Sequence, residues 1–202
     1  MATTASPYGL KAVNHIGGTP YAGSTRLLPI ASGYASNIFN GSIVSIVAAG
    51  TVEMVTTDGS SAGNVFPAGV IGVFVGCTYS DPVTGNLLFN QFWPSGTVAA
   101  DAQAYIVDDP EVVFMAQAAG SVTQADLGQN THLNAVQSTT TGSTLNGNSN
   151  SAVDATTATT STFAFRIVDF VDGPTSTVGD AWTDLLIKFN AGVHSYTNAT
   201  GI

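Results

Sequence analysis

Three carboxylates lie close together in the stretch AYIVDDPEVVFMAQ, which places Asp108, Asp109 and Glu111 between two apolar runs. Acids grouped in this way can serve as the acid and base of a hydrolase, can bind a cation, or can cap a turn. The flanking segments decide which of these applies, because they set the direction of each side chain.

The local pattern favours a turn. Asp108 and Asp109 are neighbours, so in a strand their side chains would point to opposite faces. Pro110 fixes its own φ angle and disfavours helical geometry at Asp109. A glycosidase would need a second acid about 5 to 9 Å away across a cleft, such as Asp169 or Asp184. A calcium loop would need a DxDxDG array, which is absent. We therefore predict that the flanking segments form a hairpin whose turn holds the acids, with no catalytic residue here.

The other reactive side chains are isolated in the sequence. His15, His132 and His194 lie far apart, with no HExxH motif and no His/Cys spacing that suits zinc. Cys77, the one cysteine, follows an apolar run without a neighbouring base, which is typical of a buried structural thiol. The chain also lacks a GxSxG elbow, a GxxxxGKS/T loop and a GxGxxG motif after a strand. We predict no enzyme activity, no cofactor and no bound metal.

The charge balance excludes one class of partner. The net charge is −9, and the four permanent cations are scattered singly: Lys11, Arg26, Arg166 and Lys188. Nucleic acids and anionic membrane surfaces both require clustered basic side chains. The apolar runs are far shorter than the ~20 residues that span a bilayer, and no secretory leader is visible. The single cysteine suits a reducing cytoplasm. We expect a soluble protein that binds neither nucleic acid nor membranes.

The surface composition indicates association. Charged residues make up 8% of the chain, against about 25% in an ordinary soluble domain. Disorder is not the reason, because 44% of the residues are apolar. Interface cores are depleted of charge, so we favour a surface that partners cover. The alternative is a free β-domain with a neutral coat of Thr and Ser.

Short strand-like runs separated by turn signals every 8–12 residues predict a mainly β chain, either an antiparallel β-barrel or a sandwich. The expected strand regions are 41–57, 70–81, 86–96, 102–109, 111–117, 163–174 and 181–196. Gly72 and Gly76 are placed where a strand bends or another backbone approaches closely. Residues 121–130 predict one or two helical turns, capped by Ser121 and ended by Gly128.

Two segments differ from this pattern. Residues 1–40 contain several prolines and glycines without a sustained period, which predicts an extended N-terminal arm before a β domain at 41–202. The arm could lie on another subunit or form the first layer of its own domain. Residues 138–162 are rich in Thr, Ser and Asn and predict a long polar loop inserted in that domain. The apolar residues expected to anchor the arm on a partner are Tyr8, Leu10, Ile16, Tyr21 and Leu27.

The sequence resembles small virion structural proteins of tailed bacteriophages from marine and freshwater bacteria. The resemblance rests on the opening SPYGLKAVNHIGGTPYAGSTRLLPIASGYASNIFNG, on AGVIGVFVGCTY, DDPEVVFMAQ and ADLGQN, and on FRIVDFVDGP and GDAWTDLLIKFNAGVHSY. It spans most of the chain, and residues 138–162 lie outside it. It implies a head decoration, or cement, protein: a β-rich trimer assembled in the host cytoplasm that binds the major capsid protein on the outside of the shell. It implies no active-site residues.

Two other hypotheses remain open. A receptor- or glycan-binding protein of the virion surface would use exposed aromatic residues such as Trp93, Trp182 and Tyr196, although tryptophans beside strands usually belong to a core. A hydrolase of the cell envelope would require an acid pair that includes Asp109 and Glu111.

Overall fold

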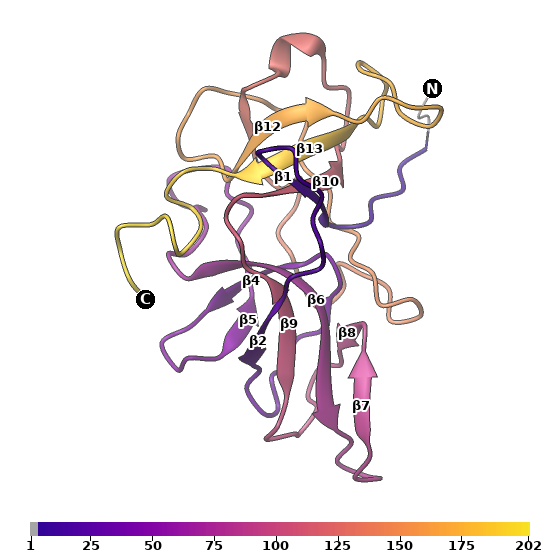
Figure 1. The fold of residues 1–202 in the computed structure, drawn as a ribbon, viewed down its shortest axis with the longest axis vertical. Helices are drawn as coiled ribbons and strands as arrows, with labels where there is room; N and C mark the ends of the chain where they lie inside the picture. Colours follow the sequence, from indigo (N-terminus) through magenta and orange to yellow (C-terminus); the bar gives the residue numbers. More distant parts are fainter. Residues whose placement is uncertain (1–3) are drawn as a thin grey trace.

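The molecule consists of two antiparallel β-sheets stacked along its long axis (Figure 1). The structure, a computed structural model, describes residues 4–202. The upper sheet has the order β1 (Lys11–His15), β10 (Val112–Gln117), β13 (Asp184–Phe189), β12 (Phe165–Phe170) and β11 (Asn130–Thr131). The lower sheet has the order β2 (Arg26–Pro29), β9 (Gln103–Val107), β6 (Val70–Ser80), β4 (Ile43–Ile46) and β5 (Val52–Met54), with β7 (Leu87–Asn90) beside β6. A small third sheet pairs β3 (Ile38–Phe39) with β8 (Phe92–Trp93). The predicted mainly β, sandwich-like fold is confirmed.

The upper core lies between the two sheets. Alternation along the upper strands directs every second side chain inward, and the register places Phe114, Ile187 and Ile167 in one cross-strand row. Val73 and Val107 of the lower sheet pack against the same cluster. This core is therefore closed on both sides by β-structure.

The lower core lies between the lower sheet and the β3–β8 pair. Ile71 and Phe74 of β6 point into it, whereas Val73 points into the upper core. Trp93 is fully buried there and meets the ring of Tyr79 edge-on at 5.3 Å. Strand β6 thus contributes side chains to both cores, which explains its near-continuous apolar sequence.

Two glycines allow β6 to serve both cores. The pairing register shifts next to Gly72 on the β4 side and next to Gly76 on the β9 side, as it does at β-bulges. Gly72 has a φ of 143°, and a Cβ there would lie 1.9 Å from the carbonyl oxygen of Val107. The prediction that these glycines mark a bend and a close backbone approach is confirmed.

The segment with the three acids is not a hairpin, and that prediction was wrong. Strand β9 pairs with β2 and β6 in the lower sheet, whereas β10 pairs with β1 and β13 in the upper sheet. Residues 108–111 therefore form the crossover between the two sheets. The turn residues were recognised correctly, but the strands on either side bury their apolar faces against different partners.

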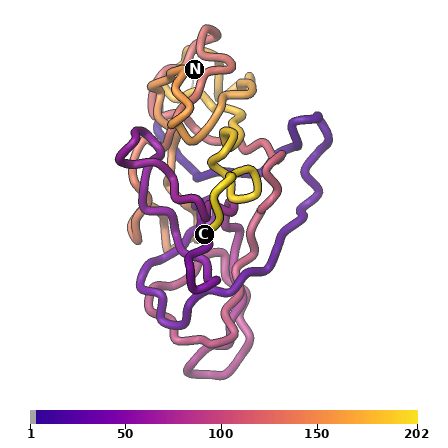
Figure 2. The backbone as a smooth tube through the Cα atoms, turned by 90° about the vertical axis from the view of Figure 1, so that its left-hand side faces the viewer, coloured from indigo at the N-terminus to yellow at the C-terminus, as the bar shows by residue number. Residues whose placement is uncertain are grey.

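The first 40 residues contribute strands to all three sheets. Strand β1 pairs with β10, β2 with β9, and β3 with β8. These three strands therefore pack on the chain's own domain, which is one of the two alternatives considered for residues 1–40. Residues 16–25 differ, because all of them except Tyr21 are exposed and the loop stands away from the body of the molecule (Figure 2).

The polar insertion is a loop, as predicted, and it is fixed to the body at several points. Residues 138–162 contain no named strand or helix, but Asn148 forms a bridge with Asn40, and Val153 forms bridges with Ala118 and Leu133. Val153 is completely buried in the upper core. Backbone hydrogen bonds and one apolar side chain therefore hold a segment that has almost no hydrophobic residues of its own.

The helical turn predicted within residues 121–130 is present as one turn, but its N-terminal cap is a different residue from the one predicted. A single 3-10 turn spans Gln124–Asp126, and Gly128 follows it with a φ of 81°. The carboxylate of Asp126 accepts hydrogen bonds from the amide and the hydroxyl of Thr123, so the cap is Thr123. The predicted cap, Ser121, instead donates to the carbonyl of Gly179. Among residues 4–202 the structure shows no helix long and apolar enough to cross a membrane.

Candidate functional site

The acids of the crossover each have a basic partner. Asp108 Oδ2 lies 2.7 Å from Arg26 Nε and accepts a hydrogen bond of 2.9 Å from the hydroxyl of Tyr196. The guanidinium carbon of Arg26 also lies 5.4 Å from the centre of the Tyr196 ring. Asp108 therefore joins the start of β2 to the C-terminal segment.

The other two acids connect the crossover to the upper sheet. Asp109 Oδ1 accepts the amide of Glu111 at 2.8 Å, which closes the local turn, and its Oδ2 lies 3.5 Å from His15 Nδ1. Glu111 Oε2 accepts a hydrogen bond of 2.9 Å from Lys188 Nζ on β13. Asp109 and Glu111 thus connect the crossover to β1 and β13 of the upper sheet, whereas Asp108 connects it to β2 of the lower sheet.

The remaining reactive groups lie in separate environments. Cys77 is buried, as predicted, and burial raises the pKa of its thiol to about 12. His194 is buried next to Phe189, and burial lowers its pKa. His132 packs edge-on against Phe163. No group of three or more His, Cys, Asp and Glu side chains within residues 4–202 could hold a metal ion.

The five predicted anchor residues divide into two groups. Leu10 is buried in the chain's own upper core. Tyr8 donates its hydroxyl to Asp184 at 3.0 Å, and burial next to that carboxylate raises the Tyr8 pKa. Tyr21 donates to the carbonyl of Ser24 within its own loop. These three side chains are engaged inside the chain.

Ile16 and Leu27 remain accessible, with exposed fractions of 47% and 50%. Ile16 lies on the projecting loop, and Leu27 lies on the outer face of β2. Of the predicted anchors, these two have the exposure that a partner contact requires.

The outer face of the lower sheet is a candidate interaction surface that combines residues of several strands. On β7, Leu87 and Phe89 point away from the lower core, with exposed fractions of 58% and 69%. The register aligns Phe89 with Thr78 of β6 and Gln103 of β9, and it aligns Tyr105 of β9 with Leu27 of β2. The outer face comprises Leu27, Pro29, Val75, Thr78, Ser80, Leu87, Phe89, Gln103 and Tyr105.

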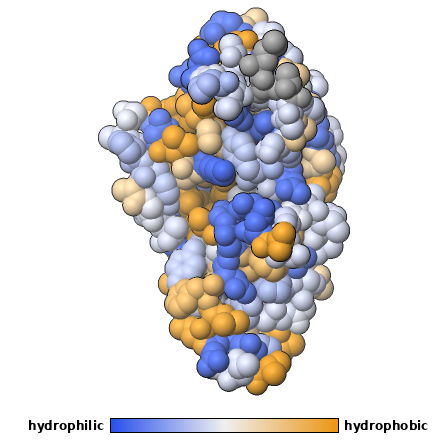
Figure 3. Space-filling view, turned by 90° about the vertical axis from the view of Figure 1, so that its right-hand side faces the viewer, coloured by the Kyte–Doolittle hydropathy of each residue, from blue (hydrophilic) through white to orange (hydrophobic). Residues whose placement is uncertain are grey.

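None of these nine residues is charged, and the nearby carboxylate of Asp101 accepts a hydrogen bond of 2.6 Å from the hydroxyl of Ser80. The nine residues are aliphatic, aromatic or neutral polar, and Figure 3 shows hydrophobic surface gathered at the end of the molecule where Figure 1 places β7. Exposed apolar patches of this kind mark interaction sites. Leu87 and Phe89 alternate with the half-buried Leu88 and Asn90. The sequence NLLFN has no alternation of apolar and polar residues, so it did not indicate which side chains would be exposed.

The aromatic residues suggested for a receptor site lie elsewhere. Trp93 is completely buried in the lower core, so it is not available to a ligand. Trp182 is half-buried, and Tyr196, although 49% exposed, is bonded to Asp108.

Comparison with known proteins assigns no family. No protein-family model matches the chain, and the searches of curated proteins and of solved structures gave no significant match.

Proposed function

We propose that this protein is a structural component of a tailed-phage virion that decorates and stabilises the outside of the capsid as a homo-oligomer. The proposal begins from the resemblance of most of the sequence to small phage virion proteins. The structural observation that supports it best is the uncharged outer face of the lower sheet. A face with exposed Leu27, Leu87 and Phe89 has the composition of an interface core rather than of an ordinary protein surface.

The projecting loop supports the same role. Residues 16–25 extend from the side of the molecule, and the side chain of Ile16 at their start is exposed. Hydrogen bonds such as that from the amide of His15 to the carbonyl of Thr19 at 2.8 Å keep the loop ordered. A preordered projection loses less entropy on binding than a flexible one. We propose that the loop and the outer face contact either the major capsid protein or neighbouring copies in a trimer.

The test is a binding assay with capsids of the encoding phage that lack this protein. Wild-type protein should sediment with the capsids, and in solution its mass should correspond to a trimer. The double variant Leu27→Ser, Phe89→Ser should lower capsid occupancy at least tenfold, because it removes apolar area from the interface. Leu145→Ser is the matched control, since Leu145 is 97% exposed and belongs to the polar insertion rather than to the strands of this face.

Two results would contradict the proposal: capsids that do not bind the wild-type protein, or equal loss of binding in the control variant. A count of copies per virion separates the decoration role from a receptor-binding tip. Decoration requires hundreds of copies, whereas a tip protein is present in a few.

A further inference from the structure

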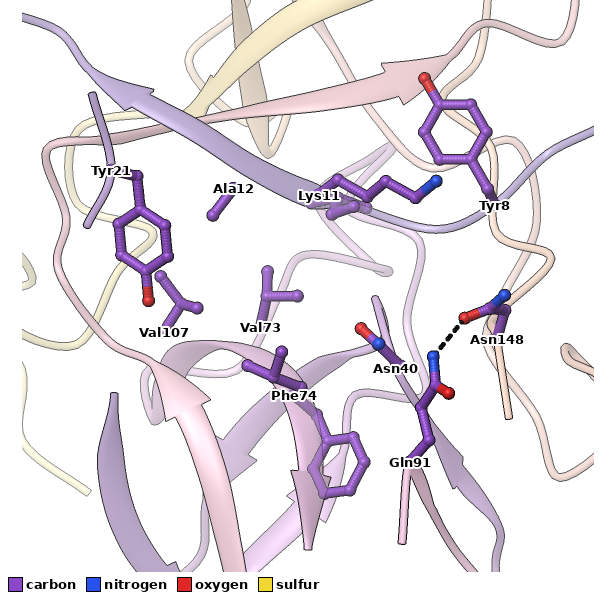
Figure 4. Close-up of a pocket in the computed structure, with 12 residues that line it drawn as sticks. Tyr8, Lys11, Ala12, Tyr21, Asn40, Val73, Phe74, Gln91, Val107 and Asn148 are labelled. Carbon is purple, nitrogen blue, oxygen red and sulfur yellow. Dashed lines mark hydrogen bonds between the residues drawn. The ribbon is translucent and has the colours of Figure 1, made fainter. Parts of the chain in front are cut away.

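A groove of about 430 Å³ lies between the N-terminal segment and the lower sheet, and at one end Val107 and Tyr21 adjoin the crossover. Residues 8–12 form one wall, and Val73 to Val75 of β6 form the floor (Figure 4). Its size falls within the range of small-molecule sites. Val75 of the outer face and Tyr21 of the projecting loop also line it, so the groove adjoins both proposed contact surfaces.

The lining has an apolar part and a polar part. Ala12, Val73 and Val107 form the apolar part, with the ring of Tyr21 beside them, while three side-chain amides lie on the opposite side (Figure 4). The amides belong to Asn40, Gln91 and Asn148. A ligand that fits this groove needs one apolar face and a set of hydrogen-bonding groups.

Two of the amides are oriented by each other. Gln91 Nε2 donates to Asn148 Oδ1 at 2.8 Å, which leaves Gln91 Oε1 as an acceptor and Asn148 Nδ2 as a donor next to it. Gly147 permits this approach, because a Cβ there would lie 2.9 Å from the Gln91 Cβ. An adjacent acceptor and donor match two neighbouring hydroxyl groups, since each hydroxyl can both donate and accept.

The third amide belongs to Asn40, whose backbone is held in place by two hydrogen bonds. The amide nitrogen of Asn40 donates to Gly147 at 2.9 Å, and the carbonyl of Asn40 accepts from Ser149 at 2.8 Å. Within residues 4–202 the side-chain amide of Asn40 makes no hydrogen bond, and Figure 4 shows it directed into the groove. It supplies a further donor and acceptor pair.

The groove carries little net charge. No carboxylate lines it, and its single cation, Lys11 Nζ, lies 4.2 Å from the centre of the Tyr8 ring. The hydroxyl of that ring bonds to Asp184, whose carboxylate balances the lysine. A phosphate or a carboxylate ligand would require more positive charge than this wall offers.

We propose that the groove binds a neutral sugar unit, with the apolar face of the pyranose ring on the valine floor and two neighbouring hydroxyls on Gln91 and Asn148. A pyranose has the required combination of one face of C–H groups and a rim of hydroxyls. Bacterial surface polysaccharides contain such units. The inference concerns the isolated protein and does not depend on capsid binding.

The test uses the full-length, ¹⁵N-labelled protein and NMR titration with the methyl glycosides of glucose, mannose and galactose. At least one glycoside should shift the side-chain amide signals of Gln91 and Asn148 saturably, with a Kd on the order of 1 mM. Gln91→Ala and, separately, Asn40→Ala should weaken binding about tenfold, because each removes one hydrogen-bonding group. Gln124→Ala, an exposed amide on the 3-10 turn, should leave the affinity unchanged.

The proposal is overturned if none of the three glycosides shifts these signals saturably. It is also overturned if the shifts persist in both groove variants, or if inorganic phosphate or glucuronate binds in place of the neutral sugars. The two groove variants are independent, so failure of one to fold leaves the other decisive.

Discussion

The inner face of the lower sheet is buried in the lower core, whereas the opposite face is covered only in part, where residues such as Val73 and Val107 enter the upper core. The inner face holds Phe74, Cys77 and Tyr79 in the lower core, whereas the outer face presents Val75 and Phe89 to solvent. Phe74 and Val75 are neighbours on β6 and point to opposite faces, and Phe89 of β7 extends the exposed face. The comparison teaches that the inner face specifies the fold, while the outer face is available for a partner.

The largest expected effect comes from the inner face. Phe74→Ala should lower the free energy of unfolding by about 3–5 kcal/mol, because it leaves a cavity beneath a fully buried ring. Chemical denaturation measures this change. A loss below about 1 kcal/mol would show that the lower core is looser than the burial of Phe74 indicates.

A substitution at the Gly72 bulge, which lets β6 contribute side chains to both cores, should lower stability almost as much. Gly72→Ala forces a Cβ against the Val107 carbonyl and should cost about 3 kcal/mol. Gly85→Ala is the matched control, since its φ is also positive but its surroundings are open, so the cost should be about 1 kcal/mol. Equal losses in the two variants would contradict the role assigned to the close approach.

The ion pair at the crossover should contribute less than packing does. Asp108→Asn should cost about 1 kcal/mol, since Arg26 is half exposed and solvent screens the pair. The difference should shrink as salt is added. Glu111→Gln, at the more exposed carboxylate, should change stability by less than about 0.5 kcal/mol. An undiminished effect of Asp108→Asn at high salt would assign it to the Tyr196 hydrogen bond instead.

Acid should destabilise the protein through His194. Burial lowers the pKa of this histidine in the folded state, against the opposing effect of Asp108 and Asp109. As the pH falls below about 6.5, the unfolded chain binds the proton first, so stability is full above that pH and declines below it. Denaturation curves between pH 7.5 and 5 should show a smaller decline for His194→Asn than for wild type, and an equal decline in the two proteins would contradict this assignment.

The smallest expected effect on stability comes from the outer face. Phe89→Ser should change the free energy of unfolding by less than about 0.5 kcal/mol, because the ring is already 69% exposed. The same change should reduce association, which sedimentation velocity measures. A large loss of stability in the monomer would mean that Phe89 stabilises the fold and is not reserved for a partner.

The fold class was accessible from the sequence because turn residues and alternating apolar runs are local signals. The special positions of Gly72 and Gly76 and the burial of Cys77 were accessible for the same reason. The fate of residues 108–111 was not, because the same Asp-Pro turn can join two paired strands or two separate sheets. Long-range pairing decides between these, and no local pattern encodes it.

The first 40 residues show the same limit. Strands β2 and β3 have four and two residues, too short for a period to be visible among prolines and glycines. They are ordered because β2 pairs with β9 and β3 pairs with β8 in antiparallel ladders. The groove amides gave no sequence signal either, because they come from distant segments: backbone hydrogen bonds join Asn40 to residues 147–149, and a side-chain hydrogen bond joins Gln91 to Asn148.

The sheet topology also has a consequence for synthesis. Every buried member of the lower core lies between Ile30 and Ile106, whereas the upper core requires residues from Leu10 to Phe189. Chains fold from the N-terminus as they leave the ribosome. The lower core can therefore assemble on the nascent chain while β1 still waits for β10 and β13. We therefore expect the lower core to form early during translation and the upper core only near its end.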